Sequence, residues 1–144
     1  MKHFGSVTAA FILSVSAIGT PPANAQRAAQ TLMGVVFFGA DSDDISPAAA
    51  ATLDAIATQF KDPKAQGVIA RGHSEPTEHA KHGAPYGVGL AQRRAVKVVS
   101  YLVEHGVPPG SITSEAFGDS RPLAGTTAAK LRRVEVVFGA GPGW

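Results

Sequence analysis

The pattern of apolar and polar residues predicts four short strands and two amphipathic helices between residues 33 and 138. Short runs rich in β-branched and aromatic residues, bounded by turn-forming residues, are typical of strands. Longer segments with apolar residues every three or four positions are typical of helices that bury one face. The predicted strands are residues 33–38, 67–71, 112–117 and 133–138, the predicted helices are residues 47–60 and 90–104, and residues 126–131 are predicted to form a short helical turn.

Residues at the helix ends support these boundaries. Ser46 is predicted to cap the first helix, with Pro47 at its first position and the proline-containing residues 61–63 ending it. Gly106, followed by two prolines, is predicted to form a left-handed cap after the second helix. Residues 74–89 hold several prolines and glycines among polar residues, so we predict a long loop there.

The order of elements, β-α-β-α-β-(α)-β, predicts the fold. Strands that alternate with helices favour an α/β (α+β) two-layer sandwich, with a mixed sheet and the helices on one of its faces. We expect one domain over residues 35–138, preceded by a short lead at residues 26–34. Residues 139–144, which are rich in glycine, are expected to form a flexible tail.

The first 25 residues resemble a secretory signal peptide. Lys2 gives a positive start, and residues 7–18 form an apolar run that is short for a bilayer span. Residues 23–25 read Ala-Asn-Ala, a typical cleavage pattern, so cleavage is expected before Gln26. An uncleaved membrane anchor is the alternative. No later segment is apolar enough for a transmembrane helix, so none is expected after cleavage.

Composition and charge narrow the function classes. The chain has no cysteine, which excludes disulfides and a lipid anchor on a cysteine, and which is compatible with a bacterial periplasm. The formal net charge is +2, and without Lys2 it is 2 − 1 = +1. Because no basic run with interleaved aromatic residues is present, we predict no nucleic-acid partner.

A carboxylate and a guanidinium near two predicted element boundaries are the most specific chemistry in the chain. Glu75 follows the second strand, and Arg94 lies in the first turn of the second predicted helix. A carboxylate binds an ammonium group and a guanidinium fork binds a carboxylate, so the pair suits a zwitterion. Arg93 and Arg94 cannot share one helix face, and Arg94 lies beside the apolar stripe. We therefore expect Arg94 to point inward.

Two other kinds of site, a metal site and an enzyme active site, have weaker support in the sequence. The segment from His73 to His82 also holds three further residues that can bind metals, Glu75, Glu78 and His79. Histidines in a polar loop are usually solvated, so we predict no metal site, and zinc binding by this segment is the third hypothesis. The serines lack a nucleophile elbow and no cofactor motif is complete, so we expect neither an enzyme nor a bound cofactor.

Four blocks in the expected order resemble the OmpA-like peptidoglycan-binding domain family, which includes the C-terminal domains of OmpA, Pal and MotB. Residues 38–45 resemble its first strand-to-helix turn, and Gly72-His73-Ser74-Glu75 resembles its Gly-His-Thr-Asp motif. The other two blocks are Leu90-Ala91-Gln92-Arg93-Arg94-Ala95, similar to a helix start, and residues 117–122 with 132–135, similar to the final turn and strand. The resemblance spans about residues 35–138.

This resemblance implies a non-catalytic, periplasmic module that binds the diaminopimelate of peptidoglycan stem peptides. It assigns the ligand ammonium to Glu75, the ligand carboxylate to Arg94 and to the backbone of the turn at Asp41, and an apolar wall to Leu90. His73 continues the strand beside this site and is a further candidate contact. Peptidoglycan is the implied partner, together with outer-membrane or envelope-complex proteins, at the outer membrane or cell wall.

A second hypothesis follows from two differences. Glu75 stands where the family has aspartate, and Gly87 stands where it usually has asparagine. The alternative is therefore a diverged OmpA-like interaction or scaffold module of an envelope complex that no longer binds peptidoglycan.

Overall fold

A computed structural model of the chain describes residues 30–60 and 67–139. The expected signal peptide, residues 26–29 of the expected lead, residues 140–144 of the expected tail, and the expected end of the first helix at residues 61–63 lie outside these ranges. In the part of the chain that the structure describes, no helix is both long enough and apolar enough to cross a membrane.

The strands form one mixed sheet of four, as predicted. They are β1 (Thr31–Phe37), β2 (Val68–His73), β3 (Ile112–Gly118) and β4 (Arg133–Phe138), in the spatial order β1-β4-β2-β3. β4 pairs antiparallel with both β1 and β2, whereas β2 and β3 are parallel. The parallel pair is connected through a long helix, as such a pair requires.

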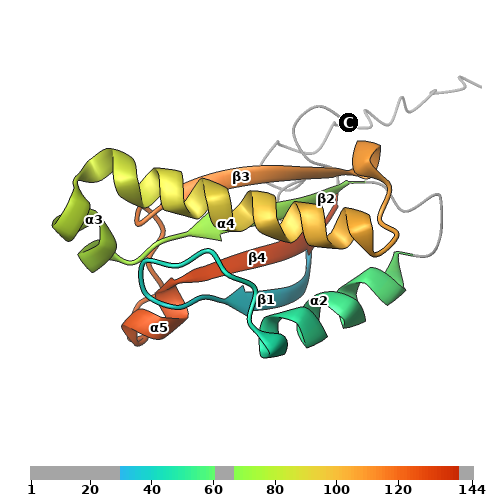
Figure 1. The fold of residues 1–144 in the computed structure, drawn as a ribbon, viewed down its shortest axis with the longest axis horizontal. Helices are drawn as coiled ribbons and strands as arrows, with labels where there is room; N and C mark the ends of the chain where they lie inside the picture. Colours follow the sequence, from blue (N-terminus) through green and yellow to red (C-terminus); the bar gives the residue numbers. More distant parts are fainter. Residues whose placement is uncertain (1–29, 61–66, 140–144) are drawn as a thin grey trace, which may run out of the picture.

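Two helices provide the second layer of the sandwich. α2 (Pro47–Gln59) packs on β1, and α4 (Ala84–Glu104) lies across β2, β3 and β4 in Figure 1. The predicted cap is confirmed, since Ser46 accepts a hydrogen bond from the Ala49 N–H at 3.2 Å. Short elements complete the chain: α3 (Pro76–His82), a 3₁₀ turn η1 (Pro109–Ser111) and α5 (Ala128–Leu131).

The core lies between the sheet and these two helices. Its members are fully or almost fully buried aliphatic and aromatic side chains, among them Val36, Leu53, Ile56, Val98, Leu102 and Val134. Gly72 permits a close approach of helix and sheet, because a Cβ atom there would collide with the Ala91 carbonyl. This contact sets the distance between α4 and the end of β2, where the predicted site lies.

The prediction of a loop over residues 74–89 is wrong. The segment forms α3 and the first six residues of α4, which begins at Ala84 rather than at residue 90. Pro76 and Pro85 lie in the first turns of these two helices, where a missing N–H costs nothing. Gly83, with φ of +90°, joins the helices in a conformation that favours glycine. The prolines and glycine therefore mark helix starts and a joint.

Candidate functional site

Arg94 lies at the centre of the polar network, and its predicted inward orientation is confirmed. The residue is fully buried, with a relative exposure of 0%. It projects from the middle of α4, so its predicted place in the first helical turn is wrong, because α4 begins ten residues earlier than Arg94. The guanidinium carbon lies 5.5 Å from the centre of the Phe38 ring.

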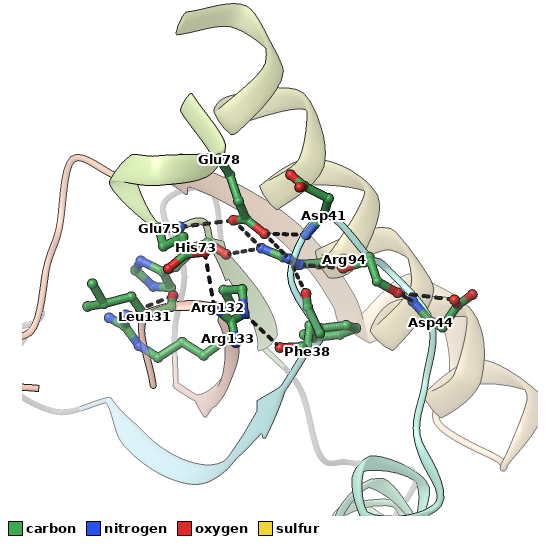
Figure 2. A network of polar contacts seen from close by, with 12 residues as sticks. Phe38, Asp41, Asp44, His73, Glu75, Glu78, Arg94, Leu131, Arg132 and Arg133 are labelled. Carbon is green, nitrogen blue, oxygen red and sulfur yellow. Dashed lines mark hydrogen bonds and ion pairs between the residues drawn. The ribbon is translucent and has the colours of Figure 1, made fainter. Parts of the chain in front are cut away.

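All five N–H groups of the Arg94 guanidinium are hydrogen-bonded (Figure 2). Two bind the Glu78 carboxylate, Nη1 to Oε2 at 3.0 Å and Nη2 to Oε1 at 2.6 Å. The other three donate to backbone carbonyls, those of Ser42 at 2.8 Å, His73 at 3.2 Å and Gly39 at 2.9 Å. The turn after β1, the end of β2 and helix α3 are thus joined by one side chain.

The Glu78 carboxylate is the acceptor on which four N–H groups converge. Besides the two from Arg94, Oε1 accepts from the Asp41 amide at 2.9 Å and Oε2 from the Glu75 amide at 3.0 Å. Burial alone would raise the pKa of Glu78, but the hydrogen bonds from Arg94 and from the two amides outweigh burial and lower it. Glu78 is therefore ionised at neutral pH.

Glu75 does not pair with the Arg94 side chain. Its carboxylate instead accepts from Arg132 Nη1 at 3.0 Å, and both side chains are largely buried, with exposures of 6% and 16%. Arg132 Nε in turn donates to the Phe38 carbonyl at 3.1 Å. Glu75 and Arg94 consequently belong to one hydrogen-bonded network, which is connected through Glu78 and which we call the Arg94 network (Figure 2).

Asp41 contributes its backbone. Its φ of +51° places it in the left-handed region, which few residues other than glycine adopt. In this conformation its amide donates to Glu78. Its side-chain oxygens lie 3.7 Å from Lys81 Nζ and 3.6 Å from His82 Nε2, so the side chain contacts the end of α3.

His73 and Leu90, the remaining predicted site residues, are both buried. The His73 carbonyl accepts from Arg94, while its ring stacks on Phe117 with centroids 5.4 Å apart. Because successive side chains of a strand face opposite sides and Gly72 faces α4, the His73 ring lies on the other face of the sheet. Leu90 is one helical turn from Arg94 on the buried side of α4.

A second carboxylate with a lowered pKa lies on that other face. The pKa of Glu135 is lowered to about 2. Interactions with His73 and with Arg133 lower it, and together they outweigh burial, which raises it. His73 Nε2 is 3.7 Å from Glu135 Oε1, beyond hydrogen-bond distance, whereas Arg133 Nε donates to that oxygen at 2.8 Å. We therefore attribute most of the shift to Arg133.

Sequence reasoning missed the roles of Glu78 and Arg132. Glu78 was considered only as a metal ligand, yet its spacing from Glu75 is that of a capping box, in which an N-cap residue and the third helical residue bond reciprocally. That spacing, with Pro76 at the first helical position, is the signal that could have located α3. Arg132 was noted only as part of the final sequence block.

The histidines of α3 pair with different carboxylates. His79 Nδ1 lies 2.9 Å from Asp119 Oδ2, whereas His82 approaches Asp41. Over residues 30–60 and 67–139, no group of three or more histidine, aspartate or glutamate side chains is placed to hold a metal ion.

A surface hollow of about 590 Å³ lies elsewhere, along α4. Its lining includes Asp43, Ile45, Arg93, Val96 and Tyr101 and none of the predicted ligand residues. It is separate from the Arg94 network.

Comparison with known proteins identifies the family. Residues 37–135 match the OmpA family. The chain belongs to the OmpA family. It is 34% identical over 105 residues to outer membrane protein A of Shimwellia blattae, an alignment that covers 72% of this chain and 42% of that protein. The chain therefore spans less than half of this curated relative.

Solved structures of the same family share the fold. The OmpA-like domain of FopA1 from Francisella tularensis superposes with a TM-score of 0.66 at 20% identity, covering 74% of this chain and 70% of that one. The peptidoglycan-associated lipoprotein of Burkholderia pseudomallei has a TM-score of 0.64 at 24% identity, covering 72% and 88%. The mixed sheet and helix layer described above are thus those of an OmpA-like domain.

Proposed function

We propose that this chain is a non-catalytic, periplasmic cell-wall binding module that binds the diaminopimelate of peptidoglycan stem peptides at the Arg94 network. The observation that carries the proposal is the convergence of four N–H donors on one carboxylate. Two come from the Arg94 fork and two from the amides of Asp41 and Glu75. Such a donor set is built to recognise a carboxylate.

A zwitterion needs an acidic group beside this donor set. The Glu75 side chain provides this group, because its carboxylate belongs to the same residue as one of the amide donors. The carboxylate accepts a hydrogen bond from Arg132. A diaminopimelate side chain carries an ammonium and a carboxylate on one carbon. An acceptor and a donor set that are fixed close together favour such a group over a simple amine or a simple acid.

The proposal extends to location and partners. We place the protein in the periplasm, at the cell wall or the outer membrane, after removal of residues 1–25. The names of its relatives support this location, since they include an outer membrane protein and a peptidoglycan-associated lipoprotein. Outer-membrane or envelope-complex proteins are further proposed partners.

One observation favours the second candidate, a scaffold module that no longer binds peptidoglycan. Glu78 already occupies the donors that a ligand carboxylate would use. If this closure were permanent, the domain would retain its fold and serve only for contacts with other proteins. Wall binding by the wild-type protein distinguishes the two candidates.

The test is sedimentation with purified sacculi at low and moderate ionic strength. Arg94→Lys keeps the charge but loses the two-pronged fork, whereas Arg93→Lys makes the same change on the exposed side of α4. We expect wild type and Arg93→Lys to sediment alike and Arg94→Lys to bind at least about tenfold more weakly. Failure of the wild type to sediment would instead favour the scaffold hypothesis.

A further inference from the structure

We propose that Glu78 is an internal carboxylate ligand, and that wall binding requires helix α3 to move away from Arg94. The inference rests on the proposed function and adds a regulatory step to the same site. Glu78 takes the two fork N–H groups of Arg94 and the amide of Asp41. These are the groups that the family resemblance assigns to the carboxylate of the ligand.

Polar contacts hold α3 in place. Glu78 is the only buried residue of this helix, which the structure describes in full. Its other ion-pair contacts are that of His79 with Asp119 and the longer approaches of Lys81 and His82 to Asp41, all between partly exposed side chains. The His82 ring also lies 4.3 Å from the Tyr86 ring, between centroids, at the start of α4. Exposed ion pairs stabilise weakly. Glu78 therefore supplies most of the docking, and moving α3 exposes no buried apolar side chain of its own.

The helix is also able to move independently of the core. Its seven residues are too few for a helix that is stable by itself in water. Gly83, with φ of +90°, separates it from α4, and none of its residues belongs to a strand of the sheet. Segments of this kind open locally at a lower free energy than the whole domain.

Opening leaves a formed site behind. Three backbone carbonyls, those of Ser42, His73 and Gly39, continue to hold the Arg94 guanidinium, so its fork stays aimed at the place that Glu78 vacates. The amides of Asp41 and Glu75 become available at the same time. Because the ligand and Glu78 compete for one place, the apparent association constant equals the intrinsic one multiplied by the fraction of molecules that are open.

Gly87 is an independent indication that α3 belongs in the docked position. A Cβ atom there would lie 3.1 Å from Ser74 Oγ and 3.4 Å from His79 Cβ. A larger side chain, such as the asparagine usual in the family, would therefore press against α3. The glycine at this position makes room for the helix that carries Glu78.

The experiment compares two glutamate variants in the sacculus sedimentation assay. Glu78→Ala removes the internal carboxylate, and Glu104→Ala makes the same change in charge at an exposed position near the end of α4. We expect Glu78→Ala to bind about tenfold more tightly than wild type or better, since a charge-assisted pair no longer competes. Glu104→Ala is expected to match wild type.

The outcomes separate the inference from the proposed function. Equal binding by wild type, Glu78→Ala and Glu104→Ala overturns the inference alone. Absence of binding by all three overturns the proposed function and the inference with it.

Hydrogen exchange on the wild-type protein keeps the inference testable if Glu78→Ala does not fold. Addition of soluble muropeptides is expected to reduce the protection of α3 amides while that of α4 is kept. Unchanged or increased protection of α3 in the bound protein overturns the inference.

Discussion

Replacement of Arg94 by alanine should destabilise the domain severely, apart from any effect on binding. The change leaves the Glu78 carboxylate with only its two amide donors, and it leaves three backbone carbonyls, of which that of His73 is buried, without the Arg94 donors they now have. Breaking a buried ion pair by removing one partner costs about 3–5 kcal/mol. Because a small domain has about 5–15 kcal/mol of total stability, the variant should be close to unfolding.

Urea denaturation followed by circular dichroism measures this cost. Arg93→Ala is the matched control, since Arg93 is exposed on the neighbouring helix position, and its cost should stay within about 0.5 kcal/mol. Glu78→Ala should cost clearly less than Arg94→Ala, because departure of α3 lets water reach the guanidinium. A cost below about 1 kcal/mol for Arg94→Ala would refute the reasoning that the buried network stabilises the fold.

Three further predictions concern the same network. The lowered pKa of Glu78 means that its contribution to stability is present above the ordinary value of 4.5 and is lost as the pH falls through the folded value. The stability difference between wild type and Glu78→Ala should therefore shrink below pH 4.5 in urea titrations, and a constant difference would contradict it. Gly87→Asn should crowd Ser74 and His79 and reduce the hydrogen-exchange protection of α3, whereas unchanged protection would show that α3 tolerates the side chain. Glu75→Gln should weaken sedimentation with sacculi at least about tenfold while changing the affinity for a simple carboxylate such as acetate little, and equal losses for both would remove the ammonium role of Glu75.

Local signals in the sequence were sufficient for most of the fold. Ser46 and Pro47 located the start of α2, and the β-branched run at Arg133–Phe138 located β4 to the residue. These elements obey rules that act within a few neighbouring residues. The order of strands in the sheet depends on contacts between distant segments, so the sequence predicted a mixed sheet without its order β1-β4-β2-β3.

The prediction of a loop over residues 74–89 was wrong for a physical reason. Helix α3 buries a single residue, and that residue is a glutamate, so no apolar periodicity reveals the helix. Its proline and glycine were interpreted as signs of a loop, although both residue types also occur at helix starts and joints. Only the spacing of Glu75 and Glu78 carried the opposite signal.

The site was predictable in part. The apolar stripe of Ala91 and Ala95 correctly indicated that Arg94 points inward, and this orientation follows from helix geometry alone. The partner of Arg94 was not predictable in the same way. Glu78 is buried because donors from three separated segments meet around it, and such a meeting exists only once the chain is folded.

The most direct test of the central claim follows the amide signals of Asp41 and Glu75 by NMR while a soluble muropeptide containing meso-diaminopimelate is added to the wild-type protein. These two amides donate to the Glu78 carboxylate in the closed site. If the ligand carboxylate replaces Glu78, both signals shift saturably, together with those of α3. Saturating muropeptide that leaves the signals of Asp41 and Glu75 unmoved would contradict the claim that this network binds the cell wall.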